Sequence, residues 1–74
     1  MSGLRKRSVV VSGHATSVSL EEEFWRELTT AAKRRNLSLN ALISEIDMAR
    51  DGNLSSALRL FVLREVRAGD SNSL

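Results

Sequence analysis

A six-residue segment, residues 15–20, constrains the fold more than any other part of the chain. Small polar and apolar residues alternate in it, which is typical of a strand with one buried and one exposed face. In this register one side carries Thr16, Val18 and Leu20, and the other carries Ala15, Ser17 and Ser19. A single short strand cannot form a sheet alone. We therefore expect it to pair, and the nearest candidate is the same strand of a second copy of the chain.

Length and composition also favour association between copies. The chain has 74 residues, which predicts one small domain. The core of such a domain supplies only about 3–5 kcal/mol. The chain has no cysteine and one histidine, which excludes disulfides, thiolate zinc sites and a multi-histidine metal site within one chain. Oligomerisation remains as the source of additional stability, and we expect no metal or cofactor.

The positive charge is concentrated near the N-terminus. Arg5, Lys6 and Arg7 are the only charged residues among residues 1–20, whereas residues 21–74 carry the remaining eight bases and all nine acids. A basic segment that leads into a short strand suits a polyanion such as nucleic acid, but it is equally compatible with a solvated terminus. Charge alone leaves both interpretations open.

The sequence predicts three regions: a flexible basic arm over residues 1–7, a structured domain over residues 8–68 and a disordered polar tail over residues 69–74. Gly13 interrupts the β-branched residues that precede the alternating segment. Residues 8–20 therefore form either one kinked extended arm or a small hairpin. No apolar run approaches the ~20 residues of a membrane helix, so we expect a cytoplasmic protein with no membrane partner.

A first helix is expected over residues 22–36. Acidic residues 21–23 lie at its start, where the helix dipole favours negative charge. Ser19 and Glu22 have the spacing of a capping box. Asn36 is a suitable stop.

Two further helices are expected after a tight connection. Ser38 is a good N-cap for a helix over residues 39–50, and Asn53 for a helix over residues 54–67. The third helix is apolar on most of its surface and therefore needs cover on several sides.

The sequence offers little support for catalysis. It has no glycine-rich phosphate loop and no metal-ligand cluster, and no nucleophile motif surrounds any serine that His14 could serve. We therefore expect no enzyme and no catalytic residues. A helix-turn-helix motif that reads DNA bases is also a poor fit. The third helix is too apolar to present polar side chains to base edges, and phosphates would repel Glu45 and Asp47 of the second helix. The strand is the better reader, since a two-stranded ribbon fits the major groove.

The order of these elements resembles the ribbon-helix-helix family of DNA-binding repressors, and in particular a bacterial subgroup with a third helix. The resemblance covers roughly residues 15–46. The matching residues are Thr16, Ser17, Val18, Ser19, Leu20, Phe24, Trp25, Leu28, Ala32, Asn36, Leu37, Ser38, Leu39, Asn40, Leu42 and Ile43, with Gly13-His14 ahead and residues 53–59 behind.

The resemblance implies a mainly α fold with one short β-strand, assembled as an intertwined homodimer with an extra C-terminal helix. The paired strands would enter the major groove of double-stranded DNA. The positions that match base-reading residues are Ala15, Ser17 and Ser19. The expected phosphate contacts are Arg5, Lys6, Arg7, Ser38, Leu39 and Asn40. The expected dimer core consists of Val18, Leu20, Phe24, Leu28, Leu42, Ile43, Ile46, Leu58 and Phe61.

The expected function is that of a nucleoid-associated, repressor-like regulator of transcription that binds specific DNA sequences. The family often has long basic or amide side chains on the outer face of the ribbon, whereas this chain has Ala and Ser there. Specificity would then rest on the basic arm, on His14 or on DNA shape. The alternative is a protein-interaction module or an antitoxin-type subunit that uses the apolar third helix, although the short segment after Gly69 argues against an antitoxin.

Overall fold

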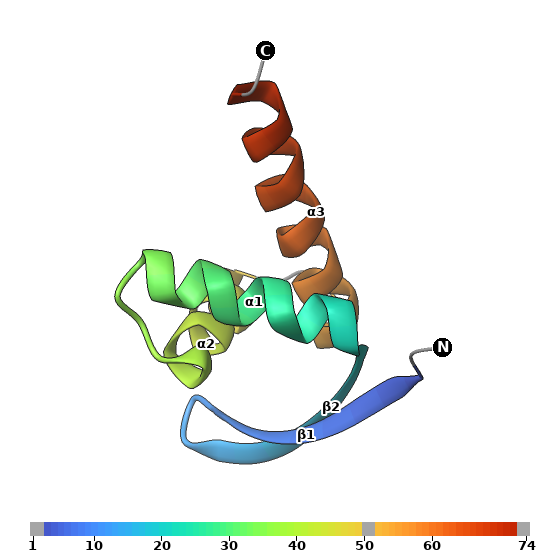
Figure 1. Ribbon diagram of the computed structural model, residues 1–74. Coiled ribbons are helices and arrows are strands. Elements are labelled where there is room, and N and C mark those ends of the chain that lie inside the picture. Colours follow the sequence, from blue (N-terminus) through green and yellow to red (C-terminus); the bar gives the residue numbers. More distant parts are fainter. Residues whose placement is uncertain (1–2, 50–51, 73–74) are drawn as a thin grey trace.

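The N-terminal part of the protein is a β-hairpin in the computed structural model, which describes residues 3–49 and 52–72. Strand β1 (Leu4–Val11) pairs antiparallel with strand β2 (His14–Glu21) of the same chain (Figure 1). The turn residues Ser12 and Gly13 have φ values of 51° and 81°. Positive φ at both positions is what a two-residue hairpin turn of type I′ requires.

The hairpin decides between the two arrangements that the sequence left open, and it corrects two expectations. The structure has two strands where one was expected. The nearest partner of β2 is β1, not the same strand of a second copy, because the two-residue turn brings β1 alongside it. Within the described residues the sheet has only these two strands, so no third strand lies on the edge of β2 that faces away from β1.

The ends of the chain also differ from expectation. Strand β1 begins at Leu4, so residues 4–7 are paired with β2 and are not part of a flexible arm. Helix α3 (Leu54–Asn72) continues through the first residues of the expected disordered tail. Residues 1–2 of the expected arm, the expected helix end at residue 50 and residues 73–74 of the tail lie outside the described residues.

Helix α1 (Glu22–Arg34) begins without the expected capping box. Its N-cap is Glu21, and no side chain caps it. Ser19 cannot serve because it lies within β2, paired with Lys6. The C-terminus of α1 is followed by Asn36, the expected stop residue, whose positive φ of 57° ends the helical conformation. The next amide, from Leu37, donates to the carbonyl of Ala32 at 2.9 Å, as in a Schellman motif.

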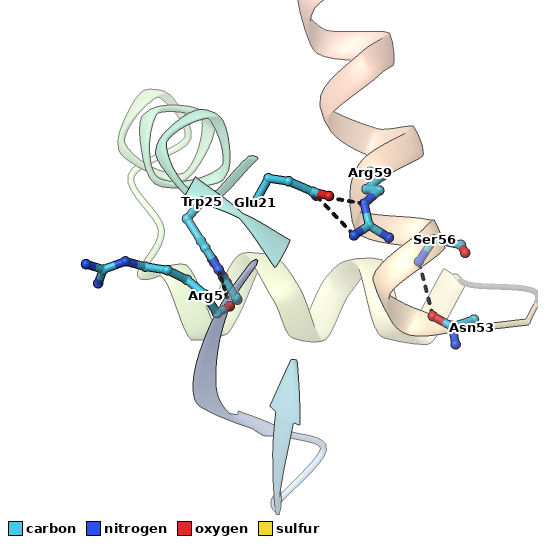
Figure 2. A network of polar contacts seen from close by, with 6 residues as sticks. All are labelled: Arg5, Glu21, Trp25, Asn53, Ser56 and Arg59. Atoms are coloured by element: carbon cyan, nitrogen blue, oxygen red, sulfur yellow. Dashed lines mark hydrogen bonds and ion pairs between the residues drawn. The ribbon is translucent and has the colours of Figure 1, made fainter. Parts of the chain in front are cut away.

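The two later helices begin at the caps that the sequence predicts. Helix α2 (Leu39–Ala49) follows Ser38, whose hydroxyl accepts a hydrogen bond from the N–H of Ala41 at 3.0 Å. Helix α3 follows Asn53, whose side-chain oxygen accepts from the N–H of Ser56 at 3.2 Å (Figure 2). Both caps satisfy amides that would otherwise have no partner at the helix start.

One face of the hairpin and all three helices enclose a single core. The hairpin supplies Val9, Val11, Val18 and Leu20, and the helices supply Trp25, Leu28, Ala31, Ala32, Leu42, Ile43, Leu58 and Val62. Val18 and Leu20 are thus buried, as the alternation predicts. Thr16, expected on the same buried face, is exposed because it lies at the rim of the core, beside an open pocket near His14.

Two arginine clusters attach α3 to the rest of the chain. Arg59 donates two hydrogen bonds to one oxygen of Glu21, at 3.0 and 3.1 Å (Figure 2), and its guanidinium lies 5.7 Å from the ring centre of Phe24. Arg35 binds both carboxylate oxygens of Glu65, at 2.9 and 3.0 Å. Its guanidinium lies 5.0 Å from the ring centre of Phe61. Beyond these contacts the C-terminal part of α3 extends away from the hairpin and from α1 and α2 (Figure 1).

These ion pairs make the attachment of α3 sensitive to acid. The hydrogen bonds from Arg35 lower the pKa of Glu65, and a backbone hydrogen bond together with Arg59 lowers the pKa of Glu21. A carboxylate whose pKa is lower in the folded chain stabilises the fold above its unfolded pKa of about 4.3. That contribution disappears as the pH falls through the lower, folded value.

We therefore expect the thermal midpoint to be constant above about pH 5 and to fall progressively below it. Glu65→Gln should lower the midpoint at neutral pH and weaken its dependence on acid. Glu27→Gln, at an exposed position of α1, is the control and should preserve the wild-type pH profile. Thermal unfolding followed by circular dichroism from pH 7 to pH 3 checks this. A Glu65→Gln profile with the wild-type acid dependence would contradict it.

Candidate nucleic-acid interface

Strand alternation and the hairpin register divide the side chains of the hairpin between two faces. Beyond Leu4 and Glu21 at its open end, the outer face, opposite the core, is formed by the cross-strand pairs Lys6 with Ser19, Ser8 with Ser17, and Val10 with Ala15. Of these six residues, five are exposed and Ser19 is half-buried. The three expected base-reading residues therefore lie together on one exposed face, and β1 contributes neighbours that the sequence did not assign to it.

The three basic residues of the expected arm do not all lie on this outer face of the hairpin. Arg5 and Arg7 alternate with Lys6 and lie on the side of the hairpin that faces α1. Arg5 forms an ion pair with Glu22, with 2.8 Å between Nε and Oε1, and its carbonyl accepts a hydrogen bond from the indole of Trp25 at 2.9 Å (Figure 2). The guanidinium of Arg7 lies 5.4 Å from the ring centre of Trp25. Only Lys6 of the three lies on the outer face.

The N-terminal half of α2 lies against the edge of β1 that faces away from β2. The N–H of Val10 donates to the side-chain oxygen of Asn40 at 3.4 Å, and the hydroxyl of Ser44 donates to the carbonyl of Val10 at 3.3 Å. These contacts bring the N-terminus of α2, where phosphate contacts were expected at Ser38, Leu39 and Asn40, beside the hairpin. A helix N-terminus favours an anion through its free amides and its dipole.

The two edges of the hairpin differ in whether their outward backbone groups have hydrogen-bond partners. In a two-residue hairpin the residues flanking the turn form a hydrogen-bonded pair, and the pattern then alternates along the strands. Ala15, Ser17 and Ser19 consequently direct their backbone N–H and C=O groups away from β1. Within the described residues these outward groups of β2 form no backbone hydrogen bond outside the hairpin, whereas α2 binds the edge of β1 at Val10. The open edge can therefore accept another strand.

The residues expected in a dimer core all contribute to the core of one chain. Six are buried within it: Val18, Leu20, Leu28, Leu42, Ile43 and Leu58. The other three, Phe24, Ile46 and Phe61, are half-buried and pack against that core. A single chain thus has a continuous core of its own.

Sequence reasoning missed several core residues. Val9 and Val11 are buried on the hairpin, and Trp25 of α1 is only 2% exposed. The β-branched run at residues 9–11 was a usable signal for a second strand, although three consecutive valines do not show which face is buried. Burial of Trp25 depends on the backbone of β1, which the helix pattern alone does not show.

The described residues hold no metal site and no membrane-spanning helix. In residues 3–49 and 52–72 no group of His, Asp and Glu side chains is arranged to hold a metal ion. Among the helices so described, none is both long and apolar enough to cross a membrane.

Comparisons with known proteins agree with the fold. A sequence profile of the ribbon-helix-helix domain matches residues 4–66. A solved structure, that of an uncharacterized protein from Bordetella pertussis Tohama I, is 28% identical and superposes with a TM-score of 0.84 over 97% of this chain. The match spans 62% of the length of that protein. No curated protein matches the chain.

The division of β2 into two faces predicts a large effect on stability at one of two neighbouring residues and a small effect at the other. Val18→Ala removes buried methyl groups and should cost roughly 2 kcal/mol of unfolding free energy. Ser17→Ala, on the exposed face, should change it by less than about 0.5 kcal/mol. Chemical unfolding of both variants provides the comparison. A silent Val18→Ala together with a destabilised Ser17→Ala would mean that the strand register is shifted by one residue.

Proposed function

Because the chain belongs to the ribbon-helix-helix family, we propose that it is a homodimeric, sequence-specific DNA-binding regulator of transcription that acts as a repressor in the bacterial cytoplasm. Ribbon-helix-helix domains are typically DNA-binding regulators or antitoxins. The observation that carries the proposal is the exposed outer face of the hairpin with the N-terminus of α2 beside it. A narrow β-ribbon flanked by an anion-binding helix end suits the major groove and its phosphate walls.

The outer face of β2 offers small contacts to base edges. The hydroxyls of Ser17 and Ser19 can donate or accept a hydrogen bond, and the methyl group of Ala15 can contact a thymine methyl. The amides at residues 38–40 would hold a phosphate and fix the position of the ribbon in the groove. Since serine reads several bases, the sequence-dependent shape of the DNA would supply part of the specificity.

The dimer in this proposal forms through the open edge of β2. Antiparallel pairing of β2 with β2 of a second copy, symmetric about Ser17, would satisfy the backbone groups of Ala15, Ser17 and Ser19. It would keep Val18 and Leu20 of both copies on the core side. The edge of β1 is unsuited to this role because Asn40 and Ser44 already bind Val10.

Cysteine cross-linking distinguishes the two edges, since the chain has no cysteine of its own. Ser17→Cys should form a disulfide-linked dimer on mild oxidation, because the two copies of residue 17 would be direct cross-strand partners, with about 5.5 Å between their Cα atoms. Ser8→Cys is the matched control: it lies on the same exposed face but one strand further from the axis. Non-reducing gels give the result. Cross-linking through Ser8→Cys and not through Ser17→Cys would place the dimer seam on β1.

DNA binding is tested with a duplex selected from a random pool. The affinity should fall linearly with salt on a log–log plot and exceed that for random DNA at least ~10³-fold. Ser17→Glu places a carboxylate at the centre of the reading face and should abolish binding, whereas Glu27→Gln should bind as the wild type does. Fluorescence anisotropy measures both variants. A wild-type chain with no salt-dependent DNA affinity, or a Ser17→Glu variant that binds normally, would overturn the proposal.

A second candidate function is a protein-interaction module or antitoxin-type subunit, and one observation favours it. Leu60, Leu63 and Val66 of α3 are 50%, 46% and 43% exposed, which leaves an apolar stripe on the helix that extends from the body. Such a stripe suits a helix-binding protein partner. This candidate replaces the first if the wild-type protein shows no salt-dependent affinity for DNA.

A further inference from the structure

We propose that Lys6 is the phosphate contact that strand β1 adds to the DNA interface, and that its neighbours Arg5 and Arg7 instead cover Trp25. This inference rests on the proposed DNA-binding function. It assigns different roles to three consecutive basic residues, each of which carries one positive charge. It also makes β1 a second DNA-contacting strand, next to the base-reading strand β2.

Arg5 and Arg7 are occupied on the α1 side of the hairpin. The guanidinium of Arg7 lies over the ring of Trp25, 5.4 Å from its centre, where it covers an aromatic face that is otherwise part of the core. Arg5 forms an ion pair with Glu22 at 2.8 Å, and its backbone carbonyl satisfies the indole N–H of Trp25. These contacts position both side chains on the face of the hairpin opposite the reading residues.

Lys6 points the other way. It pairs across the hairpin with Ser19 and shares the exposed outer face with Ser8 and Ser17. Among the hairpin residues that alternate onto this face, Lys6 is the only base. Ala15, Ser17 and Ser19 offer hydrogen bonds and a methyl group but no positive charge. Lys6 is thus the charge that can hold this face against a polyanion.

The width of the sheet indicates that Lys6 meets a phosphate and not a base. In the proposed dimer the two β2 strands lie at the centre and a β1 strand flanks each of them. Strands are about 4.8 Å apart, so each β1 lies about 7 Å from the dimer axis. The major groove is only about 12 Å wide, which places β1 at its walls. A lysine there reaches the sugar–phosphate backbone, where it contributes affinity without reading sequence.

The test compares three variants in the full-length dimer on the selected duplex and on random DNA. Lys6→Ala should weaken binding to both duplexes by the same factor. It should also reduce the log–log salt slope by about 2, because each of the two lysines accounts for about 0.9. Its thermal midpoint should stay at the wild-type value. Lys6→Arg should restore the slope, since either cation can contact a phosphate.

Arg7→Ala is the matched control, because it removes one positive charge per chain from the adjacent position of the same strand. It should keep the wild-type salt slope and lower the thermal midpoint, since it uncovers Trp25. Equal slopes for Lys6→Ala and wild type, or an equal loss in Lys6→Ala and Arg7→Ala, would overturn the assignment while leaving DNA binding intact. A flat salt dependence in the wild-type protein would instead overturn the proposed function itself.

Discussion

The antiparallel pairing of β1 with β2 is the constraint on which the rest of the structure depends. The two-residue turn at Ser12-Gly13 fixes the register, and the register sends alternate side chains of both strands into the core. Val9 and Val18 are buried by this arrangement while Ser8 and Ser17 remain on the opposite face. A shift of one residue would bury the serines and expose the valines. One set of backbone hydrogen bonds therefore determines both the core and the candidate interface.

The same pairing supplies the contacts that bury Trp25 and places the basic residues of β1 on two different faces of the hairpin. The indole N–H needs an acceptor once the ring is buried, and the carbonyl of Arg5 supplies it. Arg7 covers the ring from the same side. The strand that completes the core thereby keeps two arginines away from the outer face and leaves Lys6 there. The stability of the hairpin and its proposed charge distribution toward DNA are thus linked through a single tryptophan.

Much of this arrangement could be predicted from local sequence patterns. Alternation placed Val18 and Leu20 on the buried face of β2, and Ser38 and Asn53 were recognised as helix caps because their side chains act on amides three residues away. The valines at residues 9–11 favour a second strand, but Gly13 is compatible with a bend as well as a turn, so the sequence alone does not choose the hairpin. The roles of Arg5 and Arg7 depend on contacts with α1 across the hairpin, and the full length of α3 passes through Gly69, which local propensity reads as a stop.

The central claim is that the outer face of the hairpin, with the N-terminus of α2, is the surface that meets DNA. It is tested most directly by titrating ¹⁵N-labelled protein with a selected duplex and mapping the amide chemical-shift changes. We expect the largest changes at Lys6, Ser8, Ser17 and Ser19 and at residues 38–41, with little change along the exposed stripe Leu60, Leu63 and Val66. Changes concentrated on that stripe of α3, with the hairpin unaffected, would contradict the claim.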